Sequence, residues 1–245
     1  MTQNVRIAAA GDLHYTVGSR GALRRVFGEV RARADVLLLC GDLTDNGLPE
    51  EAAILAEDLH MIGIPTLAVL GNHDFESGAA DVVTAELRRV GVKVLDGDSC
   101  VIGEIGFVGV KGFGGGFGRR ALGPWGESAI KHFVQEAVDE TMKLERAMAR
   151  LSTETRVVLL HYAPIQETVV GEAVEIYPFL GSSRLEEPIE RYGAAFAVHG
   201  HCHHGAPEGR TRSGTPVYNV AMPLLRRAFP GQAPFRTFEV PTQRN

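Results

Sequence analysis

The sequence has no apolar run long enough to cross a membrane. Its longest apolar stretches, such as residues 36–40, have the length of a β-strand, well below the roughly 18 residues that a bilayer requires. The N-terminus, Met1 to Arg6, lacks the basic segment and apolar core of a signal peptide. Three cysteines without a CxxC spacing argue against a disulfide scaffold. We therefore expect a cytoplasmic protein with no membrane partner.

Positive charge is also scarce, because 25 Lys and Arg residues stand against 30 Asp and Glu residues. The resulting net charge of −5 argues against a broad basic face, so we expect no stable nucleic-acid partner. The hydrophobic fraction of 44% is that of an ordinary globular chain. No repeat or Pro/Ser-rich linker divides the sequence, and we expect a single domain over residues 1–245. The oligomeric state stays open.

Short leucine-rich or β-branched runs alternate with amphipathic segments along the chain. We expect strands at residues 5–10, 36–40, 65–70, 104–110, 156–161, 194–199, 216–220 and 237–240. Several of these runs show little polar alternation, which is typical of strands covered on both faces. Helices are expected from Pro49 to about Ile62 and over residues 127–151, where apolar residues recur near the 3.6 period. The pattern predicts an α/β layered fold.

Residues 111–126 are rich in glycine and include the triplet from Gly114 to Gly116. We expect a mobile surface loop, because the spacing is not GxGxxG and no Gly-Lys-Ser/Thr follows. The loop and the helix at 127–151 could together cap a functional site. Whether this loop contacts substrate is left open, as it is for two arginine pairs, Arg119/Arg120 and Arg226/Arg227.

Polar side chains follow five of the expected strands, at the point where each strand ends. In chain order these side chains are Asp12 and His14, then Asp42, then Asn72, His73 and Asp74, then His161, then His201 and His203. Ligands of open α/β sheets bind beyond the carboxyl ends of the strands, so we expect these groups to share one crevice. The i, i+2 pairs would face one side if their backbone is extended.

The chemistry of these side chains indicates a metal site. Asp, Asn and His supply oxygen and nitrogen donors without thiolate, a set that suits Mn, Fe, Zn, Co or Ni. These potential ligands exceed the need of one tetrahedral ion, and a carboxylate can bridge two, so we predict two metal ions. Taken alone, each residue could instead have a structural role, as part of a turn or as a hydrogen-bonded histidine in the core. Five such blocks in order argue against coincidence.

At this point the sequence resembles the calcineurin-like metallophosphoesterases. Their pattern of D-x-H, GD-x-x-D/N, GNH-D/E, a lone His and GH-x-H is present in order over residues 12–203. The resemblance implies a layered sandwich of two mixed β-sheets flanked by helices, with a dimetal site at the carboxyl ends of strands. It also implies hydrolysis of small-molecule phosphoesters by a hydroxide that bridges the two ions.

The resemblance further assigns a role to each residue. Asp12, His14 and His203 would hold one ion. Asn72, His161 and His201 would hold the other, and Asp42 would bridge both. His73 would donate a proton or contact a phosphate oxygen, with Asp74 positioning its ring, and Asp45 would support the site without binding metal. Mn, Fe or Zn are the favoured ions, with Co or Ni as further options.

Some features fit more than one function or have no role in the expected site. The motifs around Asp42 and His161 look closest to the bacterial cyclic-nucleotide phosphodiesterase branch, which favours phosphodiesters. A phosphomonoesterase, a protein phosphatase or a non-catalytic binding module of the same fold are the alternatives. We assign no role to His60 and His132, and His199 and His204 are either support or surface residues. Cys40 and Cys202 are expected in the core.

Overall fold

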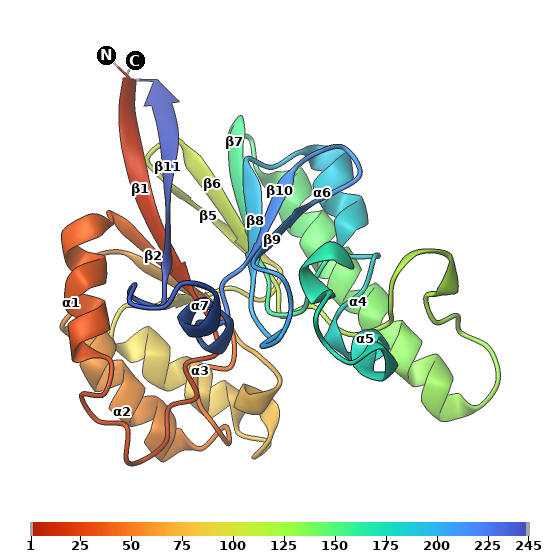
Figure 1. Cartoon of the computed structure of the whole chain (residues 1–245), viewed down its shortest axis with the longest axis horizontal. Coiled ribbons are helices and arrows are strands. Elements are labelled where there is room, and N and C mark those ends of the chain that lie inside the picture. Colours follow the sequence, from red (N-terminus) through yellow and green to blue (C-terminus); the bar gives the residue numbers. More distant parts are fainter. Residues whose placement is uncertain (1, 244–245) are drawn as a thin grey trace.

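The computed structural model describes residues 2–243, which form two β-sheets packed face to face (Figure 1). The first sheet has the order β11-β1-β2-β3-β4. Its strands are β1 (Thr2–Ala10), β2 (Val36–Cys40), β3 (Thr66–Val69), β4 (Lys93–Val94) and β11 (Arg236–Gln243). Neighbours from β1 to β4 are parallel, whereas β11 is antiparallel to β1, so the sheet is mixed.

The second sheet has the order β5-β6-β7-β8-β10-β9 and is also mixed. Its strands are β5 (Asp98–Ile102), β6 (Ile105–Gly109), β7 (Thr155–Leu159), β8 (Phe196–His199), β9 (Glu208–Arg210) and β10 (Pro216–Asn219). The expected α/β sandwich of two mixed sheets is confirmed.

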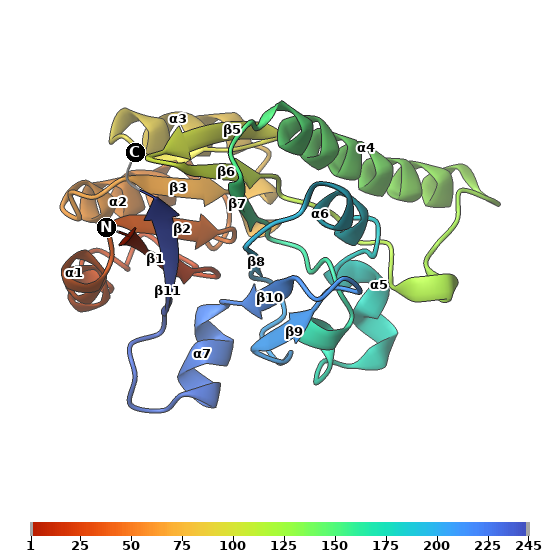
Figure 2. The same cartoon turned by 90° about the horizontal axis from the view of Figure 1, so that it is seen from above.

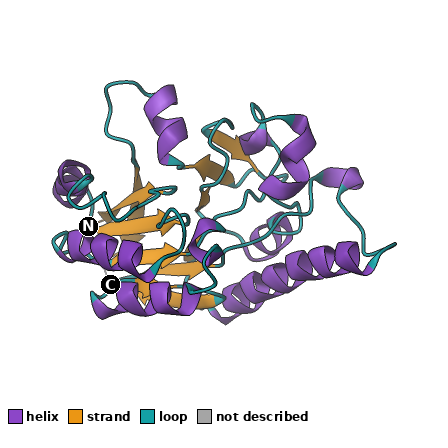
Figure 3. Cartoon of the chain, turned by 90° about the horizontal axis from the view of Figure 1, so that it is seen from below, coloured by secondary structure: helices purple, strands orange, loops and turns teal. Residues whose placement is uncertain are grey.

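Helices cover the outer faces of both sheets (Figures 2 and 3). The first sheet carries α1 (Arg24–Arg33), α2 (Pro49–His60) and α3 (Ala80–Arg89), and the second carries α4 (Ser128–Arg150) and α6 (Glu186–Tyr192). The short elements are α5 (Tyr177–Leu180), α7 (Met222–Ala228) and the 3-10 turns η1 (His73–Phe75), η2 (Gly118–Arg120), η3 (Glu167–Val169) and η4 (Val174–Ile176). The helix expected at 127–151 is α4.

Strand β2 is apolar throughout because both of its faces are buried. Its alternate side chains Val36, Leu38 and Cys40 pack between the two sheets. Leu37 and Leu39 point the other way and pack against the helices of the first sheet. Because successive side chains of a strand point to opposite faces, both faces of β2 are buried and no polar position is left.

The start of α2 is fixed by its own sequence and orders the loop before it. Pro49 occupies the first turn, where its missing N–H costs nothing. The Glu51 carboxylate accepts hydrogen bonds from the backbone N–H groups of Asn46 (2.8 Å) and Leu48 (3.3 Å). Leu55 and Leu59 then pack beneath the sheet, each contributing about 2 kcal/mol of burial. The segment between β2 and α2 is therefore held at its α2 end.

The glycine-rich segment differs from the expected surface loop over its first half. The backbone from Gly114 to Phe117 is buried. Gly116 donates to the carbonyl of Gly181 at 2.9 Å, and a Cβ at Gly114 would overlap the carbonyl oxygen of Pro178. The glycines thus allow two backbone segments to pack closely, which a loop with side chains could not do. Only the second half, from Gly118 to Glu127, has an exposed surface over most of its length.

The carboxyl ends of the parallel strands meet at one edge of the two sheets. Figure 1 shows β1 running from the chain termini down toward this edge, where the loops from both sheets come together, and β2 is parallel to it. Backbone bonds join the loops, since Asp12 donates to the carbonyl of Gly41 and Gly11 donates to that of Val220, each at 2.9 Å. None of the helices within residues 2–243 has the length and hydropathy that a membrane crossing requires.

Candidate metal centre

The loops that carry the polar side chains adopt an unusual backbone conformation. The non-glycine residues with positive φ in the described chain are Asp12 (57°), His14 (47°), Asp42 (47°) and His201 (69°). The left-handed region costs a non-glycine residue about 1–3 kcal/mol and occurs most often at functional sites. The i, i+2 pairs therefore converge through left-handed turns, and not through the extended backbone expected from the sequence.

Glycines allow these loops to approach one another. Gly41 has a φ of 79°, and a Cβ at this position would overlap the ring of His161. A Cβ at Gly71 would overlap the backbone nitrogen and the carboxylate of Asp42. The loops after β2, β3 and β7 can meet only because these two positions carry no side chain.

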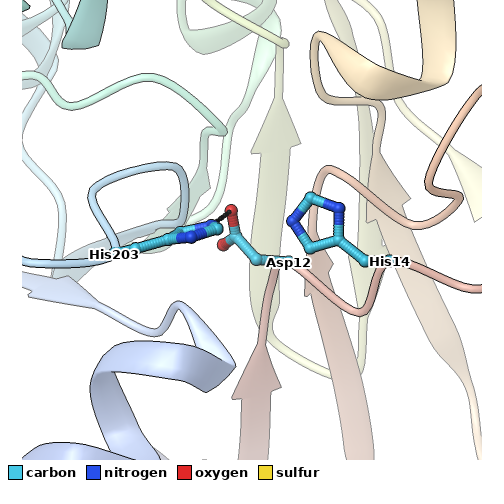
Figure 4. A group of neighbouring side chains, drawn as sticks. All are labelled: Asp12, His14 and His203. Atoms are coloured by element: carbon cyan, nitrogen blue, oxygen red, sulfur yellow. Dashed lines mark hydrogen bonds and ion pairs between the residues drawn. The ribbon is translucent and has the colours of Figure 1, made fainter.

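The first cluster contains Asp12, His14 and His203 (Figure 4). One donor atom from each lies within 4.8 Å of the others, and Nε2 of His203 is 2.9 Å from Oδ1 of Asp12. Burial of Asp12 raises its pKa, but the His203 hydrogen bond and the surrounding imidazoles outweigh it and lower the pKa below its ordinary value. The carboxylate is therefore ionised and available as a ligand.

The second cluster contains Asp42, His161 and His201, again with donor atoms within 4.8 Å of one another. Nδ1 of His161 donates to the carbonyl of Cys40 at 2.9 Å, so the neutral ring presents a lone pair at Nε2. That Nε2 faces Oδ1 of Asn72 at 3.0 Å and Oδ1 of Asp42 at 3.4 Å. Three electron-pair donors directed at one another are the arrangement that a cation stabilises.

Asp42 lies between the two clusters. Its Oδ1 is near His161, and its Oδ2 is 4.0 Å from Nε2 of both His14 and His73. Nε2 of His14 is buried and has no hydrogen-bond partner among the described residues. An orphaned buried nitrogen beside a buried carboxylate fits a metal ligand, because such an atom otherwise loses its hydration without compensation. The donor set therefore fits one ion in each cluster, with Asp42 adjacent to both.

His73 lies beside this centre, and its ring contacts that of His14 edge-on with centroids 4.7 Å apart. Its Nδ1 is 2.7 Å from the carbonyl oxygen of Asp45. Burial lowers the pKa of His73, but this hydrogen bond and the charges of Asp42, Asp45 and Asp74 outweigh it, so the net pKa is raised. His73 therefore holds a proton to a higher pH than a free imidazole.

Asp74 does not position the ring of His73, contrary to the expectation from the sequence. Its fully buried carboxylate accepts backbone hydrogen bonds from Leu43 (3.2 Å), Thr44 (2.8 Å) and Gly71 (2.8 Å), and one from the hydroxyl of Thr44 (2.6 Å). Asp74 thus ties the loop after β2 to the loop after β3. The ring of His73 is held instead by the backbone carbonyl of Asp45.

The remaining histidines and arginines divide into two groups. His60, His132, His204, Arg119 and Arg120 are exposed. His199 is buried, with Nε2 bonded to the hydroxyl of Thr168 at 2.8 Å, and burial lowers its pKa to about 4. Arg226 and Arg227 are both exposed, and Arg227 donates to the carbonyl of His203 at 2.7 Å and so braces the loop of a candidate ligand. Cys40 and Cys202 are buried, as expected.

Sequence reasoning missed the contribution of residues 177–180. The carbonyl oxygen of Phe179 lies 3.2 Å from Nε2 of His201, and the ring of Tyr162 lies 4.6 Å from that of His201, measured between centroids. These contacts hold the His201 ring in place. A role for Tyr162 could have been predicted, because it follows His161 in the sequence. No sequence signal points to the backbone carbonyl of Phe179.

Comparison with known proteins gives a family match over most of the chain. The model of a family described as calcineurin-like phosphoesterase matches residues 5–205. A protein of Synechococcus described as a probable cyclic nucleotide phosphodiesterase is 38% identical over 78 residues, which are 28% of this chain and 31% of that protein. The matched part thus spans less than a third of that relative.

Solved structures share the fold at low sequence identity. The phosphopantetheinyl hydrolase of Mycobacterium tuberculosis is 16% identical, with a TM-score of 0.71 and coverage of 95% of both chains. GAP50 of Plasmodium, described as an anchor in the inner membrane complex, is 11% identical, with a TM-score of 0.53 and coverage of 90% of this chain and 72% of its own. The fold alone therefore does not determine whether a protein is a hydrolase or an anchor.

Proposed function

The chain belongs to the calcineurin-like phosphoesterase family, and from this premise we propose that it is a dinuclear-metal-dependent hydrolase that prefers phosphodiesters. The observation that carries the proposal is the pair of donor clusters with the Asp42 carboxylate between them. The preference for diesters draws on the relative described as a cyclic nucleotide phosphodiesterase and on the motifs around Asp42 and His161.

Each cluster has the donors for one ion. Asp12, His14 and His203 hold the first ion in this proposal. Asn72, His161 and His201 hold the second, and Asp42 binds both. Bound divalent ions supply a water of lowered pKa and neutralise the charge of the phosphate. Carboxylate, amide and imidazole donors suit Mn, Fe or Zn, with Co and Ni as alternatives.

His73 is the acid in this proposal. Hydrolysis forms a bond from a water oxygen to phosphorus and breaks the bond from phosphorus to the ester oxygen. The departing oxygen needs a proton, and Nε2 of the His73 imidazolium can supply it while Nδ1–H remains bonded to the Asp45 carbonyl. The raised pKa of His73 favours this protonated form.

The described chain acts as one domain in this proposal, because the two sheets share a continuous core and contribute ligands to the same edge. The exposed half of the glycine-rich segment and α4 would form a wall beside the centre. Both lie on the side of the second sheet, next to α5 and the Phe179 carbonyl that contacts His201 (Figure 2).

Hydrolysis of two chromogenic esters tests the proposal directly. Protein loaded separately with Mn²⁺, Fe²⁺, Zn²⁺, Co²⁺ or Ni²⁺ is assayed on bis-p-nitrophenyl phosphate and on p-nitrophenyl phosphate. We expect metal-dependent cleavage with a preference for the diester, loss of activity in His203→Ala, and unchanged activity in the exposed control His132→Ala. A preference for the monoester would favour a phosphatase, and no cleavage with any ion would favour a non-catalytic binding module.

A further inference from the structure

A cavity of about 330 Å³ lies between α3, the end of β3 and the start of the glycine-rich segment. Its volume is within the range of about 300–1,000 Å³ that small-molecule sites occupy. Most of its wall is apolar, and Leu70, Phe75, Val94 and Leu95 contribute to it. Two cationic side chains, Arg88 and Lys111, also line the cavity.

The cavity adjoins the candidate metal centre through three short connections. Leu70 precedes Asn72 by two residues, and Phe75 belongs to the same 3-10 turn as His73. The backbone carbonyl of Lys111 accepts the N–H groups of His161 at 3.0 Å and Tyr162 at 3.1 Å. The cavity and the candidate metal centre are therefore built on the same loops, and Lys111 takes part in both, with its side chain in the cavity wall and its backbone carbonyl bonded to His161.

Lys111 is held by aromatic rings and lacks an anionic partner. Its Nζ lies 4.8 Å from the ring centroid of Phe113, 5.3 Å from that of Tyr162 and 5.6 Å from that of Phe75. Its one hydrogen bond goes to the carbonyl of Gly112 at 2.9 Å. Among residues 2–243, no carboxylate lies within ion-pair distance of this Nζ. Rings stabilise an ammonium but do not neutralise it, so two donor positions and the charge remain available.

Two of the nearby carboxylates, those of Glu140 and Asp96, already have partners. Glu140 accepts the backbone N–H of Gly112 at 2.8 Å and the ammonium of Lys143 at 2.7 Å. Asp96, which lines the cavity, pairs with the same Lys143 at 3.0 Å. Asp81 also lines the cavity but is exposed at the first turn of α3. Burial lowers the pKa of Lys111, and the more distant charges of Glu140, Glu136 and Asp96 offset this effect only in part.

We propose that this cavity binds the organic group of the phosphoester, and that Lys111 selects substrates in which an apolar chain carries a second anionic group. The apolar wall fits the chain, and the ammonium pairs with a carboxylate or a phosphate at its end. This inference rests on the proposed function, because the scissile phosphate must lie at the metal centre. It adds the substrate class and names a residue that contacts the substrate.

The test compares two series of p-nitrophenyl phosphodiesters with the Mn²⁺-loaded protein. In one series the second ester group is an alkyl chain of two to six methylenes, and in the other the same chain ends in a carboxylate. We expect kcat/KM to be roughly tenfold higher or more for the carboxylated ester at one or more chain lengths. Calorimetric binding of the corresponding ω-carboxyalkyl and alkyl phosphonates should show the same preference without turnover.

Three variants assign the preference to Lys111. Lys111→Met keeps the apolar stem and should lose the preference while still cleaving the alkyl esters. Lys111→Arg should retain it, and so should Lys131→Met, the same change at an exposed position of α4. Cleavage of both series at equal rates by the wild-type protein overturns this inference alone. Cleavage of neither series overturns it together with the proposed function.

Discussion

The Asp45 carboxylate lies 3.2 Å from Nδ1 of His14, across the ring from the nitrogen that has no partner. A proton shared between Asp45 and Nδ1 leaves the lone pair of His14 on Nε2, which faces Asp42 at 4.0 Å. The backbone carbonyl of the same residue holds the ring of His73. Asp45 therefore orients two imidazoles, and with His14 and His73 it forms a third group of possible donors beside the two clusters.

Replacement of Asp45 should weaken metal binding. In Asp45→Ala, His14 loses the acceptor that fixes its tautomer, and we expect about 10–100-fold weaker Mn²⁺ binding, measured by calorimetry. Activity should recover at saturating Mn²⁺, because the ligands themselves remain. Asp35→Ala is the matched control, since Asp35 pairs with Arg6 on the surface. Equal affinity in both variants would show that Asp45 does not orient His14.

Replacement of Asp42 should affect both metal positions at once. Asp42→Asn keeps the size of the side chain but removes the charge that lies between the clusters. We expect the metal content, measured by elemental analysis, to fall from two ions per chain to one or fewer. Asp96→Asn, which changes an exposed aspartate, should keep both ions. Two ions retained in Asp42→Asn would rule out a bridging role.

Loss of His73 should depend on the leaving group. In His73→Ala, we expect kcat to fall about 100-fold or more for an alkyl leaving group, which needs a proton, and far less for p-nitrophenolate, which does not. The metal content should be unchanged, because His73 is outside both ligand sets. Equal losses for the two leaving groups would assign His73 to phosphate binding and not to proton transfer.

The buried His199 should make the metal-free protein less stable in mild acid. Burial lowers its folded pKa to about 4, whereas the unfolded value is 6.5. Between these values the unfolded chain takes up a proton that the folded chain does not, so stability falls as pH decreases, by roughly 3 kcal/mol in total.

Urea unfolding in the presence of a chelator, from pH 7 to pH 4.5, measures this effect. His199→Gln removes the titrating group, so the difference in unfolding free energy between wild type and variant should shrink as pH falls. The exposed His132→Gln is the control and should leave the pH dependence unchanged. A constant difference between wild type and His199→Gln would show that the ring does not stay neutral in the fold.

Most of the sheet structure could be predicted because its central strands, such as β2, β3 and β6, are apolar on both faces. All eight expected strands are present, with ends shifted by up to three residues. The missed strands β4, β5 and β9 are short or lie at sheet edges, and β5 carries polar residues such as Asp98 and Ser99 that give no strand signal. An edge strand needs only backbone pairing with a neighbour, which composition does not report.

In the candidate site, the side-chain donors could be predicted from the sequence, whereas the backbone contacts could not. The candidate donors from Asp12 to His203 could be predicted from the sequence, because they follow the ends of strands and their donor atoms are in the side chains. Three backbone carbonyls could not be predicted, because every residue has one. They belong to Cys40, Asp45 and Phe179, and they hold the rings of His161, His73 and His201 respectively. The role expected for Asp74 was wrong for this reason, since a backbone group took its place.

The antiparallel pairing of β1 with β11 places Thr2 opposite Gln243, at the far end of β1 from Asp12. The nine residues of β1 extend over about 30 Å, so the two ends of the described chain adjoin each other a full strand length from the candidate metal centre. A short linker could therefore join them in a circular permutant. A fluorophore or a surface tether attached there would leave the entrance for phosphoesters free.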